Sequence, residues 1–332
     1  MKRLCFRGHS QIDVIDMPAP VPLPGQVAID TVASALCGSE LHGYVGAGFD
    51  GGNFGHESAG VVSALGEGVT SLKVGDRVGV SAIAGCGKCK YCQRGQYTWC
   101  STWAFFGNMH SETYVTSALA CHKLPDDVPW DVGVLITGDA LGVPYHTSKM
   151  LAKYDVETIA VIGLGPIGLG HIIMQSYLGK KVIGVDIAPE RLALAKTYGA
   201  WRTIDASKGT AVEEIKALTD GGVDACIEAV GKPQTTKQCF AAVKKGGVIA
   251  FNGEHQGPVE LNVSDDFIRR DITAFGAWFY HFSEFQDMLA LYRKGLPIAK
   301  LVTHRLPLRE GAEAFRLFAS GKTGKVLLTE SS

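Results

Sequence analysis

The chain has 332 residues, a mass of 35.4 kDa and a net charge of −1 at pH 7. This length allows about two domains with full cores, and 20% charged residues without a basic excess argue against a nucleic-acid or anionic-membrane partner. The longest apolar stretch, residues 159–174, contains four glycines and a proline, which makes it a poor membrane span. The N-terminus has no apolar run of the length that a secretory signal needs, so we expect a cytoplasmic protein.

The first part of the chain, to about residue 127, has short β-branched runs separated by Gly, Pro and Asp, as at 27–32, 60–64 and 77–80. This texture predicts an all-β barrel with irregular loops. After Pro129 the pattern changes to strands that alternate with helical stretches of ten or more residues. That alternation predicts an α/β unit with a doubly wound parallel sheet.

Four cysteines within the first part follow the spacing Cys-x2-Cys-x2-Cys-x7-Cys: Cys86, Cys89, Cys92 and Cys100. Four thiolates on so short a segment can close a tetrahedral Zn²⁺ site that leaves no coordination position for a substrate. A disulfide framework and a redox Cys-x-x-Cys pair are the alternatives. The total of 9 cysteines is odd and the other five are scattered, which favours structural zinc over a bridge framework.

The second part alternates buried β-branched runs with longer helical stretches. We expect its strands at 158–162, 181–186, 202–205, 223–227 and 248–251, with a helix at 166–177 and another that begins at Pro189. The last 50 or so residues return to a mixed pattern, with helices near 282–294 and 310–319 and strands at 301–307 and 325–329. Such a segment can rejoin the first part, so that the α/β unit is inserted between two parts of the other domain.

A glycine motif opens the α/β unit. Residues 163–168 fit Gly-x-Gly-x-x-Gly, follow a buried strand and begin a helix, where backbone N–H groups and the helix dipole can hold a pyrophosphate. A glycine-rich turn without a ligand is the alternative. We predict that the dinucleotide contacts Gly163, Gly165, Pro166, Ile167 and Gly168.

Asp186 ends the next strand, eighteen residues past the last glycine of the motif. A carboxylate there accepts hydrogen bonds from the ribose hydroxyls but repels a 2′-phosphate, which predicts NAD rather than NADP. Arg191 is the counter-indication, because a nearby arginine tolerates phosphate. We also predict cofactor contacts from Val230, Phe251 and Asn252.

A second group of possible metal ligands lies earlier in the chain. Cys37 and the pair His56-Glu57 supply the thiolate, imidazole and carboxylate of a catalytic zinc site. Taken alone, His56 would more often be a hydrogen-bonded or exposed histidine, and Cys37 a small buried hydrophobic residue.

The surrounding motif decides between these interpretations. The pattern Gly-His-Glu-x-x-Gly-x5-Gly-x-x-Val at 55–69 and the sequence Val-Gly-Asp-Arg-Val at 74–78 resemble the zinc-dependent medium-chain alcohol dehydrogenases, close to their polyol (sorbitol) and threonine dehydrogenase branch. The four cysteines and the glycine motif follow in that family's order, and the resemblance covers essentially the whole chain.

The resemblance implies two domains. A GroES-like β-barrel catalytic domain would comprise residues 1–138 and 280–332, with the structural zinc lobe at 85–101, and a Rossmann NAD-binding domain would comprise 139–279. It also implies two zinc ions per chain, one catalytic and one structural, and NAD as the cofactor.

The resemblance makes Cys37 and His56 ligands of the catalytic zinc, with Glu57 beside the metal and able to enter or leave its coordination shell. Asp139 stands where a further ligand usually comes from, and a helix N-cap is the alternative role for it.

Ser39 and His42 complete the implied machinery. Zinc acts as a Lewis acid on the substrate hydroxyl, the carbon gives hydride to the nicotinamide, and the proton leaves through Ser39, the cofactor ribose and His42. As alternatives, Ser39 caps a turn and His42 is a surface residue without a catalytic role.

The sequence departs from the family pattern at three places near this site, one of which is a loop from Cys37 to His56 that is shorter than usual. Position 40 is Glu where the family usually has an Asp that partners the zinc histidine, and a usual Gly-Gly pair appears as Met109-His110. These departures predict an unusual substrate pocket. Trp103, Phe105 and Phe106 fit either an aromatic wall of that pocket or core packing.

We therefore expect an NAD-dependent oxidoreductase of secondary alcohols, acting on a sugar alcohol, cyclitol or similar polyol. The alternatives are an L-threonine or simple secondary alcohol dehydrogenase, a reductase without catalytic zinc, and a non-catalytic nucleotide-binding protein that retains the fold. The resemblance implies a homodimer or homotetramer, with the strand at 272–277 as a candidate pairing edge, and no nucleic-acid or membrane partner.

Overall fold

The computed structural model describes residues 1–49, 51–254 and 257–330. The chain divides into two compact units. The first unit consists of residues 1–142, 281–293 and the residues from Ala299 onward, and the second consists of 143–280 and 294–298. In the part that the structure describes, no helix is long and apolar enough to cross a bilayer.

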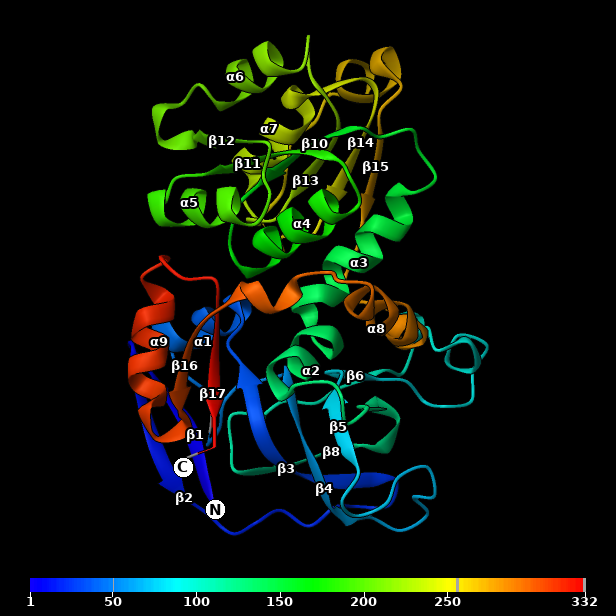
Figure 1. Ribbon diagram of the computed structural model, residues 1–332, viewed down its shortest axis with the longest axis vertical. Coiled ribbons are helices and arrows are strands. Elements are labelled where there is room, and N and C mark those ends of the chain that lie inside the picture. Colours follow the sequence, from blue (N-terminus) through cyan, green and yellow to red (C-terminus); the bar gives the residue numbers. More distant parts are fainter. Residues whose placement is uncertain (50, 255–256, 331–332) are drawn as a thin grey trace. The chain divides into compact units, whose positions relative to one another are not determined.

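The first unit is built mainly from β-strands, as the β-branched runs predicted. Its strands are β1 (Lys2–Gly8), β2 (Gln11–Asp16), β3 (Gln26–Ala35), β4 (Ser58–Leu65), β5 (Arg77–Val80), β6 (Ile83–Ala84), β7 (Ala104–Phe105), β8 (Thr113–Ser117), β9 (Cys121–Lys123), β16 (Val302–Pro307) and β17 (Lys325–Thr329). Seven of these strands form one sheet in the order β16-β17-β3-β4-β5-β9, with β8 also paired to β3. The C-terminal strand β17 lies antiparallel to β3, with Leu328 opposite Ser34, and Figure 1 shows this red strand in the same unit as the blue N-terminal strands.

Helices and short helical turns connect and cover these strands. They are α1 (Leu41–Val45), α2 (Trp130–Thr137), α8 (Phe285–Arg293) and α9 (Gly311–Ala319). The predicted helix at 282–294 begins with a 3-10 turn, Phe282–Glu284, before α8. Helix α3 (Asp139–Leu151) carries the chain from the first unit into the second.

The second unit is the parallel sheet that the alternating pattern predicted, with the order β12-β11-β10-β13-β14-β15. Its strands are β10 (Thr158–Ile162), β11 (Lys181–Asp186), β12 (Arg202–Asp205), β13 (Val223–Glu228), β14 (Val243–Phe251) and β15 (Thr273–Gly276), and its helices are α4 (Pro166–Tyr177), α5 (Pro189–Thr197), α6 (Ala211–Leu218) and α7 (Pro233–Ala242). Strand β14 begins at Val243 rather than at the predicted 248, because a register shift against β13 lets the strand pair on both sides of the glycines at 246–247.

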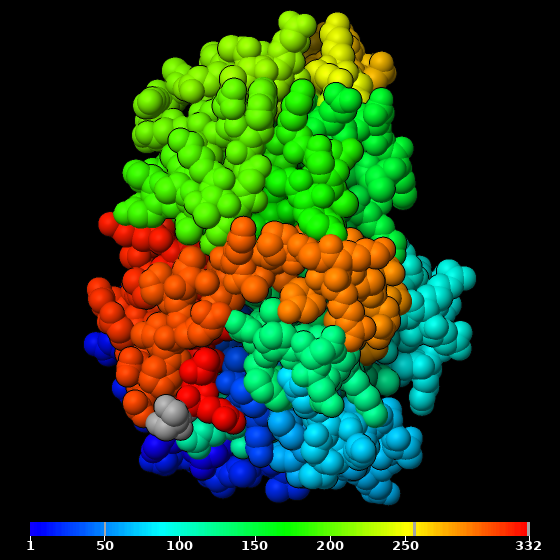
Figure 2. All heavy atoms as spheres, in the orientation of Figure 1, coloured from blue at the N-terminus to red at the C-terminus, as the bar shows by residue number. Residues whose placement is uncertain are grey.

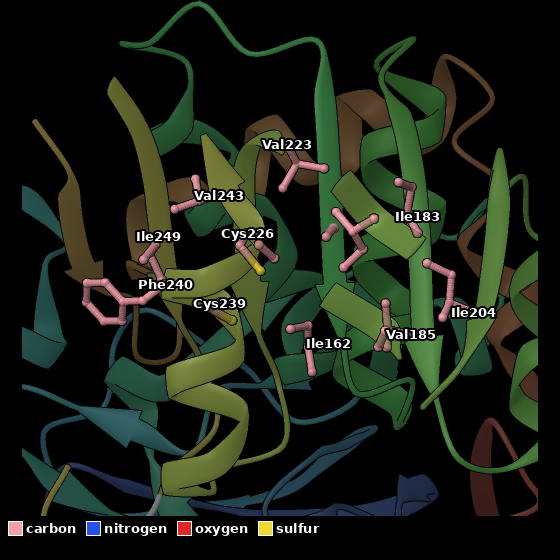
Figure 3. Packing of buried hydrophobic residues seen from close by; sticks show 14 of the residues in the cluster. Ile162, Ile183, Val185, Ile204, Val223, Cys226, Cys239, Phe240, Val243 and Ile249 are labelled. Atoms are coloured by element: carbon pink, nitrogen blue, oxygen red, sulfur yellow. The ribbon is translucent and has the colours of Figure 1, made fainter. Parts of the chain in front are cut away.

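The core of this second unit packs α6 and α7 against the strands. Figure 3 shows Cys239 and Phe240 of α7 beside Ile249 of β14 and Cys226 of β13. Burial and the neighbouring Cys226 thiol raise the pKa of Cys239 well above its ordinary value. Cys239 is therefore an inert packing residue rather than a nucleophile.

Candidate functional site

Three separate segments of the first unit bring four possible metal ligands together. Cys37 follows β3, His56 and Glu57 precede β4, and Asp139 begins α3. One ligand atom of each residue lies within 4.8 Å of the others, and all four residues are buried. We call this group the mixed site. Thiolate, imidazole and carboxylate are the donors that a catalytic Zn²⁺ takes.

His56 is oriented by its own backbone neighbourhood. Its Nδ1 lies 2.8 Å from the carbonyl oxygen of Phe54, and since a carbonyl only accepts, Nδ1 carries the proton and donates. The other nitrogen, Nε2, then faces the mixed site with its lone pair, 3.3 Å from Asp139 Oδ2. This is the tautomer that a metal-binding histidine needs.

The electrostatics of the mixed site call for a cation. Burial lowers the pKa of His56, but the charges and hydrogen bonds of Cys37 and Asp139 outweigh burial and raise that pKa well above its ordinary value. The anionic groups around His56 thus attract positive charge strongly. A divalent ion would supply that charge without protonating the imidazole that has to bind it.

Lys325 was not anticipated from the sequence, and it belongs to the same site. Its ammonium on β17 is fully buried and donates to Glu57 Oε1. The other carboxylate oxygen, Oε2, is buried without a hydrogen bond from the described residues and lies against the backbone of Gly138, where a Cβ would approach to 2.7 Å. Burial raises the pKa of Glu57, and the Lys325 ammonium opposes that rise.

The charges of this group fit a divalent metal. Ionised Cys37, Glu57 and Asp139 with the Lys325 ammonium leave two uncompensated negative charges in a buried place, and a Zn²⁺ ion would neutralise both. The free oxygen of Glu57 is an orphaned buried acceptor of the kind that a metal ion satisfies. The residues present therefore fit a zinc ion.

Aromatic rings border the mixed site on one side. Phe54 and Phe105 are stacked, with ring centroids 4.6 Å apart, and each lies 5.6 Å from the His56 ring. Of the three aromatic residues that the sequence left open, Phe105 lies beside the site, Phe106 packs on the core of the first unit, and Trp103 is exposed. Phe54 was missed, although it stands two residues before His56.

Ser39 and His42 lie on the short helical stretch that follows Cys37. Ser39 belongs to a 3-10 turn, Gly38–Glu40, and His42 to α1. Both side chains are exposed, while Glu40 between them is buried. Their part in proton transfer stays a prediction.

The four cysteines of the lobe form a second group, with one sulfur of each within 4.8 Å of the others. Cys92 Sγ lies 3.8 Å from Cys86 Sγ and 3.5 Å from Cys89 Sγ. A tetrahedral site with Zn–S bonds of about 2.3 Å has S–S edges of about 3.8 Å, so the sulfurs fit zinc. All four are free thiols.

Backbone N–H groups prepare two of these sulfurs, those of Cys86 and Cys100, for metal binding, whereas burial raises the pKa of Cys92 to about 12. The N–H groups of Lys88 and Cys89 donate to Cys86 Sγ at 3.5 and 3.4 Å and lower the pKa of Cys86. The Cys86 N–H in turn donates to Cys100 Sγ at 3.4 Å and lowers the pKa of Cys100 to about 6. The thiolate is the form that binds a metal.

The lobe packs on the segment that leads into α8. Tyr97 stacks on Phe282, Trp99 meets His281 edge to face, and the Gly95 carbonyl accepts the Ser283 N–H. Figure 2 shows the cyan surface of the lobe next to the orange surface of residues 281–293. The lobe is thus a surface attachment on the first unit rather than part of the mixed site.

The predicted dinucleotide residues of the second unit lie at the carboxyl ends of adjacent parallel strands. Gly163 follows β10 with φ +93, a conformation that favours glycine, Gly165 is the N-cap of α4, and Pro166, Ile167 and Gly168 lie in its first turn. Asp186 ends β11, Val230 follows β13, Phe251 ends β14, and Asn252 follows it. The carboxyl edge of a doubly wound sheet is where such folds bind nucleotides.

The Asp186 carboxylate joins the glycine motif to the next strand. Its Oδ2 accepts the Leu164 N–H at 2.6 Å, and its Oδ1 accepts the N–H groups of Ile187 and Ala188 at 2.8 and 2.9 Å. A carboxylate has about four acceptor positions, so one remains for a ribose hydroxyl. Arg191 lies on α5 with a buried Nε that reaches no acceptor among the described residues.

Asn252 is held by the protein itself. Its amide donates to the Ala277 carbonyl at 3.0 Å and to Thr147 Oγ1 at 3.1 Å, and its Oδ1 lies 2.8 Å from His171 Nε2. Glu228, which the sequence analysis did not single out, is fully buried and accepts the N–H groups of Val230 and Gly231 at 3.0 and 2.9 Å. It thereby fixes the loop that carries Val230.

Comparison with known proteins gives matches along most of the chain. The family described as "Alcohol dehydrogenase GroES-like domain" matches residues 23–126, and "Zinc-binding dehydrogenase" matches residues 166–294. The L-threonine 3-dehydrogenase of Pyrococcus abyssi is 31% identical over 95% of this chain and 94% of its own, and the sorbitol dehydrogenase of Bacillus subtilis is 31% identical over 79% and 78%. A crystal structure of an alcohol dehydrogenase from Escherichia coli CFT073 with NADH superposes with a TM-score of 0.87 at 29% identity and covers 99% of both chains.

Proposed function

Because this chain belongs to the zinc-dependent medium-chain alcohol dehydrogenases and is an NAD-dependent enzyme, we propose that it oxidises a secondary hydroxyl of a sugar alcohol, cyclitol or similar polyol. The observation that carries this proposal is the mixed site, in which Cys37, His56, Glu57 and Asp139 are buried around a place for one divalent ion. We further propose the catalytic role for the first unit and the NAD-binding role for the second.

Each residue of the mixed site has its own part in this proposal. Cys37, His56 and Asp139 hold the metal, and Glu57 stands beside it with one oxygen on Lys325 and the other free. Zn²⁺ supplies Lewis acidity that makes a substrate hydroxyl more acidic, and NAD⁺ accepts the hydride. Ser39 takes the hydroxyl proton, and His42, which is exposed, passes it to solvent.

The substrate class rests on the rings and charges beside His56. Phe54 is stacked between Phe49 and Phe105, and the Phe105 ring beside His56 can offer an aromatic face, which suits the C–H face of a ring polyol or cyclitol. A threonine substrate needs a cation for its carboxylate, and the ammonium at this site, that of Lys325, is already bound to Glu57. Of the two substrates in the relatives' names, sorbitol agrees better with these features than threonine does.

A substrate panel tests the proposal. NADH formation is followed with polyols, inositols, L-threonine and simple secondary alcohols, and zinc is counted per chain. We expect the highest kcat/KM on a polyol or cyclitol and two zinc ions per chain. The control is Cys37→Ser, which should lose turnover while keeping the zinc of the four-cysteine lobe. A preference for threonine would overturn the substrate class.

We also propose that two copies of the chain pair through β15. This strand ends the order of the sheet, and no further strand of the described residues covers its outer side. The unpaired backbone groups of such an edge can pair with a second β15. Light scattering should give the mass of a dimer or tetramer, and a monomer at micromolar concentration would contradict the pairing.

A further inference from the structure

We propose that His110 is a positioning residue of the mixed site, which holds Glu40 so that Glu40 in turn orients the imidazole of His56. Glu40 and His110, two of the positions at which the sequence departs from the family pattern, would then be a matched pair. This inference rests on the proposed function, because it assigns the pair to the zinc site of that reaction.

Both nitrogens of the His110 ring are engaged. Nε2 lies 2.8 Å from Glu40 Oε2, and Nδ1 lies 2.8 Å from Ser34 Oγ. Because an ionised carboxylate only accepts hydrogen bonds, Nε2 donates to Glu40, and the Ser34 hydroxyl is placed to donate to Nδ1. His110 and Glu40 are fully buried, so neither contact is weakened by competing water.

The second oxygen of Glu40 faces the mixed site. Oε1 is buried, accepts no hydrogen bond from the described residues and lies 3.6 Å from His56 Nδ1. That nitrogen already donates to the Phe54 carbonyl at 2.8 Å. A carbonyl and a carboxylate oxygen therefore flank one N–H group, which fixes the ring so that Nε2 faces Cys37 and Asp139.

His110 is fixed to the segment that carries His56. A Cβ on Gly55 would lie 2.6 Å from His110 Cδ2, so the ring fills the space beside that glycine. Asn53 Nδ2 donates to the His110 carbonyl at 3.1 Å, and Asn53 Oδ1 accepts the Gly55 N–H at 3.0 Å. The His110 ring cannot move away from Glu40 without disturbing the backbone before His56.

The pairing explains why both departures occur together. An aspartate at 40 is one methylene shorter and would leave the His110 Nε2–H buried without an acceptor, and a glycine at 110 would leave Glu40 Oε2 without its donor. Changing both residues removes the buried Nε2–H that the shorter carboxylate would leave without an acceptor, so the double variant carries one unpaired group rather than the sum of two. The two substitutions should therefore compensate each other.

A double-mutant cycle tests the pair. Glu40→Asp, His110→Gly and the double variant are prepared, and the affinity of the mixed site for Zn²⁺ is measured by competition with a chelator. Each single change should weaken this affinity about 10- to 100-fold, the range seen for groups that orient metal ligands. The double variant should recover at least about tenfold of the loss expected from independent changes.

A second readout separates positioning from general destabilisation. Co²⁺ placed in the mixed site should show an altered visible spectrum in each single variant and a spectrum close to the parent in the double variant. The four-cysteine zinc is the internal control and should stay bound throughout. If His110→Gly also loses the four-cysteine zinc, His110→Gln, which retains a donor, takes its place in the same assays. This variant should keep the affinity of the mixed site for Zn²⁺ within about threefold of the parent.

The inference would be overturned if the losses of zinc affinity of the two single variants simply multiply in the double variant. It would also be overturned if the single variants keep the affinity and the cobalt spectrum of the parent. The proposed function fails separately, when the parent protein binds zinc at the mixed site yet forms no NADH from any alcohol of the panel. In that case the zinc and cobalt measurements still decide whether His110 positions His56.

Discussion

The four cysteines of the lobe stand within residues 86–100, whereas the ligands of the mixed site come from three segments at Cys37, His56-Glu57 and Asp139. Backbone N–H groups of the lobe itself hold its sulfurs, as at Cys86 and Cys100. The mixed site instead needs the end of β3, the start of β4 and the start of α3 in their folded positions. The spacing of the cysteines along the chain brings the ligands of the lobe together, whereas the folding of distant segments brings the ligands of the mixed site together.

The two sites also differ in how they carry charge. Four thiolates around Zn²⁺ keep two net negative charges, which the lobe spreads over backbone N–H groups at the surface of the unit. The mixed site is buried, and Lys325 brings the sum of its charges to zero when the metal is present. Burial thus demands a counter-charge that exposure does not.

Loss of a lobe ligand should have the largest effect. Cys100→Ser should leave one zinc ion per chain instead of two and lower the stability of the first unit by several kcal/mol, because metal binding is part of the folding free energy of such a segment. Metal analysis after dialysis and thermal unfolding measure both. Cys121→Ala, a buried thiol outside both groups, is the control and should keep two zinc ions. Retention of two zinc ions by Cys100→Ser would contradict the assignment of one zinc ion to the lobe.

Loss of the counter-charge should come next. Lys325→Met leaves the Glu57 carboxylate buried and unpaired, which should cost about 3–5 kcal/mol of the free energy of unfolding. Urea unfolding of the zinc-loaded protein measures this cost. Lys325→Arg keeps the charge and should cost clearly less. Equal stability of the Met variant and the parent would show that the mixed site needs no counter-charge.

Acid should lower the stability of the first unit by a smaller amount, through the aromatic group of His122, Phe282 and Phe285 on which the lobe packs. His122 is stacked on Phe282 and Phe285 with ring centroids 3.8 and 4.4 Å away, and burial lowers its pKa to about 3. The unfolded chain binds a proton on this residue below about pH 6.5, and the folded chain does so only near pH 3. Stability should therefore be complete above pH 6.5 and fall by about 1.4 kcal/mol per unit as the pH drops toward 4.

His122→Phe should remove this part of the pH dependence, which urea unfolding at several pH values measures as a shallower slope. His9→Gln, at an exposed position, is the matched variant for the loss of an imidazole elsewhere. If stability falls with pH as steeply in His122→Phe as in the parent, this ring is not the source of the acid sensitivity.

The sequence predicted best what depends on neighbours along the chain. The four cysteines and the glycine motif at 163–168 are local patterns, and β10, β11 and β12 have the predicted bounds because buried β-branched runs end at turn residues. The parallel sheet follows from the alternation of strands and helices.

What the sequence did not reveal depends on contacts between distant segments. Lys325 meets Glu57 only because β17 pairs with β3, and its one visible sign was a lysine that opens an otherwise apolar strand. His110 and Glu40 were recognised separately as departures, and only the fold brings their side chains together. Phe105 and Phe106 are adjacent in sequence, yet one stacks beside His56 and the other packs on the core.

The position of Lys325 on β17 also sets an order of events during synthesis. A ribosome delivers Cys37, His56, Glu57 and Asp139 first, then the residues of the second unit, and Lys325 after them. Until β17 emerges, the acidic residues of the mixed site lack the Lys325 ammonium, and the sheet of the first unit lacks the strand between β16 and β3. The mixed site therefore gains its counter-charge only after the second unit has been made.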